Sequence, residues 1–281
     1  MKLLYLALLV HGSSVCLGNP KRGLVYVPNS AWPQDDELWI QSGSALTWYY
    51  TYNAHPNPRY SGLEFVPMMW GVGSNPESTS FLDSITKLLD AGTKITHALS
   101  FNEPDMRSEW GGSNVAPAKA ARAYIANFLP LRDRGVKVGL PAVSGAGTGI
   151  NWLREFAGNC TQLLKTDCKY DFLPVHWYDN FGGLKAHINE AAREFPNTKI
   201  WVTEYAYAHR SLKDTKDFYH QSEKYLDGNQ TIERYSYFGA FRSQVSNVGA
   251  NATFLNKAGQ LTDIGLWYLG LPGTGVDPNS G

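Results

Sequence analysis

Short apolar runs alternate with amphipathic stretches along almost the whole chain. Eight runs have the length and the content of β-branched and aromatic residues that are typical of buried strands. They cover residues 22–27, 45–50, 63–70, 96–101, 136–143, 170–178, 199–207 and 233–241. Between and after them, residues 78–92, 116–135, 150–158, 183–196 and 262–270 carry apolar positions at helical spacing. Strands that alternate with helices predict a parallel sheet covered by helices.

Eight such strands in about 250 residues match the count and length of a (β/α)8 TIM barrel, so the predicted fold class is α/β with this architecture. A doubly wound open sheet is the alternative. It would carry a glycine-rich phosphate-binding loop after its first strand, and no such loop follows residues 22–27. The segment "SGAGTGI" (144–150) follows the fifth run and lacks the G-x-G-x-x-G spacing. We expect it to form a flexible loop over the barrel mouth.

The first 18 residues have the pattern of a secretory signal peptide. One lysine precedes an apolar run at 3–10, and small residues follow up to Gly18. The run is too short to span a membrane. We therefore expect cleavage near Gly18 and a secreted, extracellular protein, either soluble or associated with a cell wall. Residues 19–281 then form a single barrel domain, with a loose tail from Gly270 that is rich in glycine and proline.

Secretion determines how the cysteines and the Asn-X-Thr triplets are interpreted. Cys16 leaves with the signal peptide, so Cys160 and Cys168 remain as a pair that we expect to form one disulfide bond. Three triplets are candidate N-glycosylation sites. They lie at Asn159, Asn229 and Asn251.

The charge balance and the missing motifs exclude several classes of function. Twenty-five basic residues balance 25 acidic ones, so we predict no basic surface for nucleic acid or anionic lipid. The remaining cysteines and scattered histidines have no zinc-site spacing. The sequence also lacks P-loop, G-x-S-x-G, H-E-x-x-H and C-x-x-C motifs. We expect no metal and no organic cofactor, and we expect a monomer because nothing indicates an oligomer.

Two glutamates follow predicted strands at positions that would bring them together. In a (β/α)8 barrel the active site lies at the carboxyl ends of the strands. The fourth run ends before Asn102 and Glu103, within "FNEPD", and Glu204 lies near the end of the seventh run. Hydrolysis of a glycosidic bond uses such a pair, because one carboxylic acid protonates the leaving oxygen and a second carboxylate stabilises or traps the positive centre. A lone glutamate at a strand end is more often a helix cap or an ion-pair partner. Because Glu103 and Glu204 both follow strands of the predicted barrel, a catalytic role becomes the better interpretation of the two residues.

Other polar and aromatic residues at the strand ends are candidates for substrate binding. Asn102 can donate to the hydroxyl next to the anomeric carbon, and Tyr178 can orient the nucleophile. His176 is either a substrate contact or a satisfied core histidine. Tryptophan rings either stack on sugars or fill the core, and the candidates are Trp48, Trp70, Trp110 and Trp177. We assign no chemistry to Asp105, which can cap the next helix or hold Arg107.

Five blocks, in this order and spacing, resemble glycoside hydrolase family 128. They are "EFVPMMWG" (64–71), "SFNEPD" (100–105), "VHWYD" (175–179), "WVTEYA" (201–206) and "RYSYFGAF" (234–241). The similarity runs over nearly the whole chain after the signal peptide. Members are secreted or wall-associated β-1,3-glucanases in a clan of retaining (β/α)8 hydrolases. The resemblance implies that Glu103 is the acid/base, that Glu204 is the nucleophile, and that the substrate is a β-1,3-linked glucan.

The sequence therefore predicts a secreted retaining glycoside hydrolase that cleaves β-1,3-glucan in two displacement steps, with endo or exo action left open. One alternative is a non-catalytic β-glucan-binding cell-wall protein. Loss of either glutamate would favour it, and both glutamates are present. A second alternative is a retaining hydrolase of another β-glycan, such as β-1,4-glucan or mannan. Only the family resemblance argues against that substrate.

Overall fold

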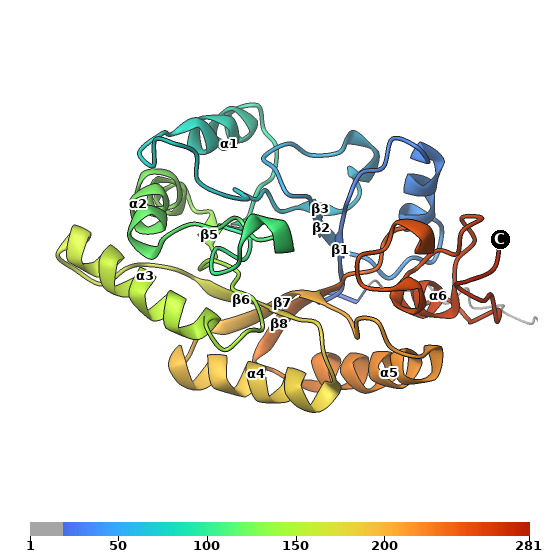
Figure 1. The fold of residues 1–281 in the computed structure, drawn as a ribbon. Coiled ribbons are helices and arrows are strands. Elements are labelled where there is room, and N and C mark those ends of the chain that lie inside the picture. The colour runs from blue at the N-terminus through green and yellow to red at the C-terminus, as the bar shows by residue number, and fades with distance from the viewer. Residues whose placement is uncertain (1–18) are drawn as a thin grey trace, which may run out of the picture.

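The computed structural model describes residues 19–281, and the predicted signal peptide lies outside the described residues. The fold is α/β, with eight short strands and intervening helices (Figure 1). The strands are β1 (Gly23–Val25), β2 (Trp48–Tyr50), β3 (Glu64–Phe65), β4 (His97–Ala98), β5 (Lys137–Val138), β6 (Phe172–Trp177), β7 (Lys199–Tyr205) and β8 (Ile232–Tyr237). The α-helices are α1 (Ser80–Asp90), α2 (Pro117–Asp133), α3 (Gly149–Leu164), α4 (Phe181–Glu194), α5 (Leu212–Gly228) and α6 (Asp263–Tyr268). Short 3-10 helices are η1 (Pro33–Ile40), η2 (Pro58–Tyr60), η3 (Ser108–Trp110), η4 (Ser243–Val245) and η5 (Ala250–Ala252).

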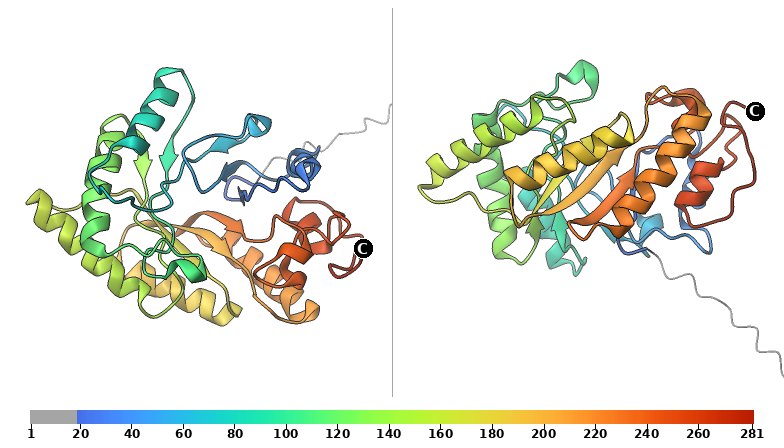
Figure 2. Two further views of the ribbon diagram at one scale, coloured as in Figure 1. Left: turned by 45° about the horizontal axis from the view of Figure 1, so that its top comes forward. Right: turned by 90° about the horizontal axis from the view of Figure 1, so that it is seen from below.

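Every ladder between these strands is parallel and joins two strands that are consecutive in the sequence. The ladders form three small sheets, in the orders β1-β2-β3, β4-β5 and β6-β7-β8. Single backbone bridges join the sheets, and they pair Met68 with Leu99, Gly139 with Phe172, and Arg22 with Tyr235. The last bridge places the start of β1 beside β8. The long helices lie outside the strands (Figure 2), so the predicted α/β alternation is confirmed.

Some strands are shorter than the apolar runs that predict them. Only two residues of the run 63–70 belong to β3, and only two of the run 136–143 belong to β5. Each run contains a proline, Pro67 or Pro141. A proline has no N–H to donate to a ladder. In these two runs the chain continues in the strand direction with isolated bridges in place of regular pairing, whereas Pro174 is accommodated within the ladder of β6.

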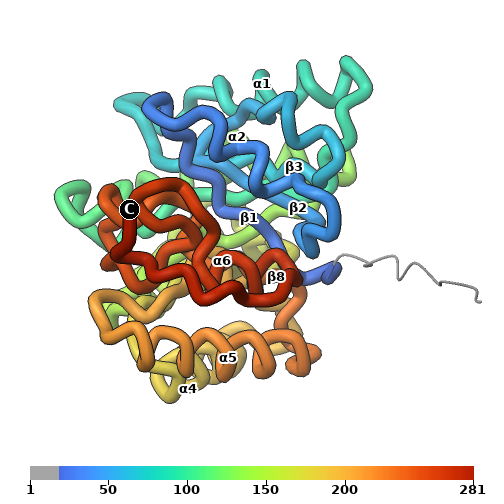
Figure 3. The backbone as a smooth tube through the Cα atoms, turned by 90° about the vertical axis from the view of Figure 1, so that its right-hand side faces the viewer, coloured from blue at the N-terminus to red at the C-terminus, as the bar shows by residue number. Residues whose placement is uncertain are grey.

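The hydrophobic pattern of the sequence does not predict helix α5, which the structure contains. It begins after Ser211, whose side chain accepts a hydrogen bond from the N–H of Asp214. Its buried face mixes apolar and polar residue types, which hides the apolar stripe: Thr215, Phe218, Tyr219, Ser222 and Leu226. Figure 3 shows α5 beside α4 and below β8. Neither α5 nor any other helix of the described chain is long and apolar enough to cross a membrane.

A partly buried polar cluster lies near the amino ends of β3, β4 and β8. The Glu64 carboxylate accepts from Arg234 at 2.7 Å and contacts His97 Nδ1 at 3.1 Å and the Thr96 hydroxyl. The Arg234 guanidinium lies 4.5 Å from the ring centre of Trp201. Burial alone would raise the pKa of Glu64, but the hydrogen bonds from His97, Arg234 and Thr96 lower it to about 2. The cluster therefore stabilises the fold in its ionised form.

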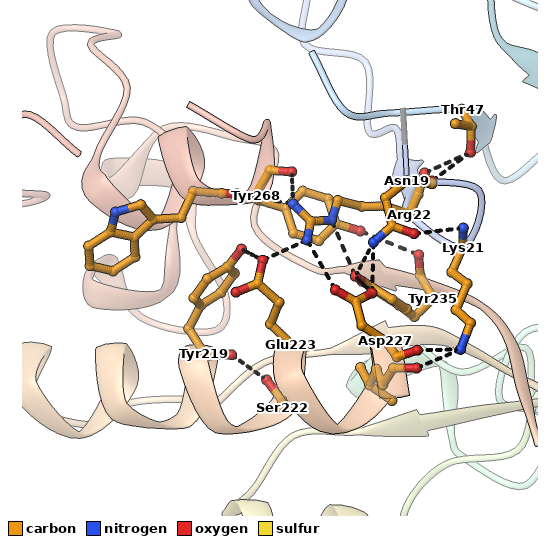
Figure 4. Close-up of polar contacts among 12 residues, drawn as sticks. Asn19, Lys21, Arg22, Thr47, Tyr219, Ser222, Glu223, Asp227, Tyr235 and Tyr268 are labelled. Carbon is orange, nitrogen blue, oxygen red and sulfur yellow. Dashed lines mark hydrogen bonds and ion pairs between the residues drawn. The ribbon is translucent and has the colours of Figure 1, made fainter. Parts of the chain in front are cut away.

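Two cations tie the start of β1 to the last elements of the chain (Figure 4). The guanidinium of Arg22 is buried, pairs with Glu223 at 2.6 Å and donates to the carbonyl oxygen of Tyr268 at 2.8 Å. The ammonium of Lys21 donates to three carbonyl oxygens at the carboxyl end of α5, those of Leu226, Asp227 and Asn229. A cation is favourable at this end of a helix because the unpaired carbonyls carry partial negative charge.

The Cys160–Cys168 disulfide, which the sequence predicts, is confirmed and joins α3 to the loop that follows it. The tail from Gly270, which we expect from the sequence to be loose, has no regular structure but makes hydrogen bonds to the rest of the domain. The N–H of Gly275 donates to Asp263 at 2.7 Å, and the amide of Asn279 donates to Asn251 at 3.0 Å. The glycine and proline content of the tail excludes regular structure, but it does not exclude anchoring by hydrogen bonds.

Candidate active site

An open cleft of about 670 Å³ lies at the carboxyl ends of the strands. All eight strands contribute to its wall from residues at or just beyond their carboxyl ends. In strand order these include Val27, Tyr52, Trp70, Asn102 with Glu103, Ser144, Trp177 with Tyr178, Glu204 and Phe238. Ligands of parallel α/β folds bind at this edge. The cleft is therefore the candidate active site.

Glu103 has an unusual backbone conformation. Its φ of 38° lies in the left-handed region, which is disfavoured for a residue with a side chain. The N–H of Glu103 donates to the carbonyl of Ala142 at 2.7 Å, and its own carbonyl accepts from the N–H of Met106 at 2.9 Å. Gly112 packs so closely that an added Cβ would lie 2.6 Å from the Glu103 carbonyl oxygen. These contacts hold a strained residue in place, as is common at functional sites.

Glu103 and Glu204 lie together on the floor of the cleft. One carboxylate oxygen of each residue and a ring nitrogen of His176 lie within 4.8 Å of one another. Both side chains are almost completely buried, with 9% and 6% of their surface exposed. Burial raises the pKa of Glu204 above its usual value, and the neighbouring Glu103 adds to the rise although His176 opposes it. Two carboxylates at this distance repel when both are ionised, so the site favours one proton between them.

Three tyrosine hydroxyls surround the Glu204 carboxylate. Tyr52 donates to Oε1 at 2.6 Å and Tyr178 donates to Oε2 at 2.5 Å. The hydroxyl of Tyr50 lies 3.3 Å from Oε1 and 3.1 Å from the carbonyl oxygen of Thr203, which is its nearer acceptor. Burial raises the pKa of all three hydroxyls well above its usual value, and Glu204 adds to each rise. They therefore stay protonated and act as donors. Only Tyr178 is a sequence-predicted site residue. The alternation in "WYYTY" (48–52) places Tyr50 and Tyr52 on one face and is the signal that could have found them.

His176 lies beneath the two glutamates and not on the cleft wall. Its side chain is 1% exposed, so it has no surface for substrate, and a direct sugar contact is wrong. Nδ1 lies 3.0 Å from Glu103 and 3.5 Å from Glu204, and Nε2 lies 3.0 Å from the Thr203 hydroxyl. Burial alone would lower the pKa of His176, but the two carboxylates outweigh it and raise the pKa. His176 is therefore a buried partner of the acid pair.

Trp48 is not a substrate-binding residue, and that expectation is wrong. Trp48 begins β2, so it lies at the amino end of the strand, away from the cleft. Its side chain is buried, with 1% of the residue exposed, and its ring centre lies 5.2 Å from that of Trp201. Its Nε1–H donates to the carbonyl of Lys21 at 3.1 Å. The ring fills the core because side chains at both ends of a parallel strand can point inward.

The other predicted tryptophans line the cleft. Trp70 and Trp110 are 39% and 71% exposed, and Trp177 is half-buried, with its indole N–H donating to the carbonyl of Asn180. Asn102 also lines the cleft, and its Nδ2 donates to the carbonyl of Gly111 at 3.2 Å. Its Oδ1 is buried and has no partner among residues 19–281. Asn102 can therefore accept through Oδ1, and the second N–H of its amide can still donate to a sugar hydroxyl, as we expect from the sequence.

Asp105 does not hold Arg107. Its carboxylate accepts from both the backbone N–H and the hydroxyl of Ser144, at 3.0 and 2.5 Å. Arg107 lies near Glu109 instead, at 3.6 Å. Asp105 therefore anchors the glycine-rich segment after β5 to the turn that carries Glu103. This anchoring limits the freedom of residues 144–150, which we expect from the sequence to form a flexible loop.

The group formed by Glu103, His176 and Glu204 is also compact enough to hold a metal ion. Both ring nitrogens of His176 already face protein partners, and the carboxylate of Glu204 accepts from Tyr52 and Tyr178. A cation would have to displace these hydrogen bonds. The donor set fits a hydrogen-bonded acid pair better than a set of free metal ligands.

An α/β fold with two buried carboxylates at the floor of an aromatic-lined cleft defines a glycoside hydrolase type of protein. The model of the glycosyl hydrolase catalytic core family matches residues 23–268. The chain belongs to this family, and within it to glycoside hydrolase family 128.

Known proteins similar to this chain include one curated relative and many solved structures. Alkali-sensitive linkage protein 1 of Schizosaccharomyces pombe is 30% identical over 258 residues, which are 89% of this chain and 44% of the relative. This chain thus spans less than half the length of that relative. One similar structure is that of a curdlan-specific exo-β-1,3-glucanase of Blastomyces gilchristii, from subgroup III of family 128, in complex with glucose. It is 30% identical to this chain and has a TM-score of 0.69, and the match covers 90% of this chain and 98% of that chain. A subgroup VII oligosaccharide-binding protein of Cryptococcus neoformans is 23% identical, with a TM-score of 0.68 over 92% and 95% of the two chains.

Proposed function

We propose that this protein is a retaining glycoside hydrolase that cleaves β-1,3-linked glucan. The observation that carries the proposal is the buried pair of Glu103 and Glu204, whose carboxylate oxygens lie within 4.8 Å of each other. Retaining enzymes hold their carboxyl groups about 5–5.5 Å apart, whereas inverting enzymes need about 6.5–9.5 Å to admit a water molecule. The short separation therefore supports a double displacement.

The tyrosines distinguish the two glutamates. Hydroxyls of Tyr52 and Tyr178 donate to Glu204, and hydrogen bonds of this kind favour the charged form of a carboxylate. Glu204 therefore attacks the anomeric carbon, while Glu103 gives its proton to the leaving sugar oxygen. In the second step a water molecule attacks the anomeric carbon and gives a proton to Glu103, and the bond between that carbon and Glu204 breaks. Because Glu204 must be ionised and its pKa is raised, activity falls as the pH drops through that raised value.

Two neighbours prepare the site for this reaction. His176 bridges the two carboxylates from below and holds Glu103 through Nδ1 at 3.0 Å. The Oδ1 of Asn102 is buried and accepts no hydrogen bond from the described residues, which costs free energy unless a ligand supplies a donor. We assign it to a sugar hydroxyl, since it lines the cleft beside Glu103.

The choice of β-1,3-glucan rests on the family and on the cleft. The Blastomyces gilchristii protein described above is a curdlan-specific exo-β-1,3-glucanase and is 30% identical. Trp70 and Trp110 expose large rings on the cleft wall, as expected for surfaces that stack on sugar faces. Both observations support a glucan substrate.

The same proposal includes a closed (β/α)8 barrel and secretion. The bridges from β3 to β4, from β5 to β6 and from β8 to β1 support closure of the strands into a barrel that forms one catalytic domain. The apolar run at 3–10 supports a signal peptide. A disulfide is typical of proteins that leave the cytosol, so it supports an extracellular location. We also retain the expectation of a monomer.

The proposal is tested with laminarin-type oligosaccharides and an aryl β-glucoside that has an activated leaving group. Glu204→Ala should lose at least about 10³-fold in rate on both substrates. Glu103→Ala should lose activity on the oligosaccharides but keep the first step on the activated substrate, because that leaving group needs no acid. Glu109→Gln is the control, since Glu109 is exposed near the cleft rim. Undiminished hydrolysis by Glu204→Ala would exclude the mechanism, and the product sizes separate endo from exo action.

An oligosaccharide-binding protein is the second candidate, because the structurally similar Cryptococcus neoformans protein has that description. The complete acid pair with its three tyrosines favours catalysis. Reducing-sugar release from β-1,3-glucan decides between the two, since a binding protein gives affinity without products. A panel that includes β-1,4-glucan and mannan tests the remaining alternative of another β-glycan.

A further inference from the structure

A second hollow lies outside the active site, where the first turn of α4 meets the last turns of α5. It has a volume of about 560 Å³ and shares no lining residue with the cleft. Its lining consists of Phe181, Gln221, Lys224, Tyr225, Gly228 and Asn229. The rings of Phe181 and Tyr225 meet edge to face at 5.8 Å. Both rings are partly exposed, and the ammonium of Lys185 lies 4.9 Å from the ring centre of Phe181. A hollow lined by partly exposed aromatic rings has the character of a binding surface.

Asn229 lies on the rim of this hollow and begins an Asn-X-Thr triplet, residues 229–231. It ends α5 in an extended conformation, with φ of −87° and ψ of 116°. Its Oδ1 accepts from the N–H of Thr231 at 2.9 Å, and its backbone carbonyl accepts from the ammonium of Lys21 at 2.9 Å. Its Nδ2 donates to no residue in the described part of the chain. The nitrogen that would carry a sugar is thus free, while the rest of the residue is fixed.

The other two triplets have their amide nitrogens engaged. Nδ2 of Asn159 donates to the carbonyl of Glu155 at 2.7 Å, inside helix α3 and next to the disulfide. Nδ2 of Asn251 donates to the carbonyl of Arg210 at 2.8 Å. The threonine of that triplet, Thr253, is fully buried. A glycan at either position would disturb hydrogen bonds that the fold uses.

We propose that Asn229 is the residue of the three that carries an N-linked glycan, and that the first sugar of this glycan packs into the hollow formed by Phe181 and Tyr225. A pyranose ring has an apolar C–H face that suits an aromatic side chain, and Asn229 lines the same hollow as both rings. The first sugar then covers the hollow, since it is attached to Asn229 on the rim of that hollow. The inference depends on secretion and is independent of the catalytic proposal.

The modification transfers an oligosaccharide from a lipid diphosphate donor in the secretory pathway. The bond between Nδ2 of Asn229 and the anomeric carbon forms, and the bond from that carbon to the diphosphate oxygen breaks. The lipid diphosphate leaves with the electron pair, and the amide nitrogen releases one proton to a base. No electron transfer takes place.

The site is tested by secreting the full chain from a eukaryotic host and measuring its mass before and after endoglycosidase treatment. We expect one glycan, and its complete loss in both Asn229→Gln and Thr231→Ala. Asn159→Gln and Asn251→Gln are the matched controls and should keep it. A secreted protein without glycan, or glycopeptides that carry the sugar at 159 or 251 and leave 229 bare, would overturn the assignment.

The packing of the sugar is tested by the rate at which an endoglycosidase releases the glycan from the folded protein. Tyr225→Ala and Phe181→Ala should each release it severalfold faster than the wild type, and the rates should become equal after denaturation. Equal rates in the folded state would refute the packing. Unchanged melting temperatures show that a variant is folded. Hydrolysis of glucan should not change in these variants, so failure here is distinct from failure of the proposed activity.

Discussion

Replacing Thr203 by valine removes a single hydrogen-bond acceptor from the buried side of the active site. The Thr203 hydroxyl lies 3.0 Å from Nε2 of His176, and Thr203 is 1% exposed. Nδ1 of His176 faces Glu103 at 3.0 Å and Glu204 at 3.5 Å. When both ring nitrogens carry protons, one faces the carboxylates and the other donates to Thr203. Valine keeps the shape of the side chain and leaves the Nε2 proton without an acceptor.

The size of the effect follows from the charge of the donor. A hydrogen bond that involves a charged group contributes about 1.5–3 kcal/mol, against about 0.5–1.5 kcal/mol for a neutral one. Losing the acceptor therefore costs protonated His176 about 1 kcal/mol more than neutral His176, which corresponds to about 0.7 of a pKa unit. The two carboxylates raise the pKa of His176 above its usual value, and Thr203→Val lowers it from there.

The assay is the pH dependence of kcat/KM on a laminarin-type oligosaccharide. If protonated His176 holds Glu103 in place, activity is lost as the pH rises through the pKa of His176. In Thr203→Val this alkaline limb should move to lower pH by about 0.7 unit. Thr203→Ser keeps the hydroxyl and is the control, which should leave the limb in place. An alkaline limb at the same pH in all three proteins would refute the coupling of His176 to the acid.

Three further predictions concern the nucleophile, the core and the disulfide. Tyr52→Phe removes a hydroxyl 2.6 Å from the proposed nucleophile, so kcat should fall about 10- to 100-fold while the melting temperature stays within about 2 °C. Glu64→Gln leaves Arg234 without its carboxylate and should lower the free energy of unfolding at pH 7 by about 2 kcal/mol, after discounting for solvent screening. Because the pKa of Glu64 is lowered to about 2, urea unfolding should show this difference shrinking as the pH falls from 4.5 towards 2. Cys160→Ser with Cys168→Ser opens a loop with a separation of 8 residues and should cost about 2.5 kcal/mol, seen as a fall in melting temperature of about 5 °C; an unchanged midpoint would contradict that estimate.

The sequence by itself determined the α/β alternation and the polar strand ends. Apolar runs separated by helical patterns need no tertiary information, because burial on both faces of a parallel strand leaves its own signature. The disulfide pair followed from cysteine count alone, once Cys16 was assigned to the signal peptide. "FNEPD" and "WVTEYA" placed Glu103 and Glu204 at carboxyl ends of strands, and the structure places them on one cleft floor.

Only the tertiary structure decided what the neighbours of the glutamates do. A strand pattern shows that a side chain points inward, but it does not show at which depth of the fold that side chain lies. Trp48 lies at the amino end of β2 and fills the core, whereas Tyr52, just beyond the carboxyl end of the same strand, donates to Glu204. His176 is fully buried between the carboxylate of Glu103 and the hydroxyl of Thr203, which are 73 and 27 residues away in the sequence. These roles depend on distances between segments remote in sequence, and such distances exist only after the chain has packed.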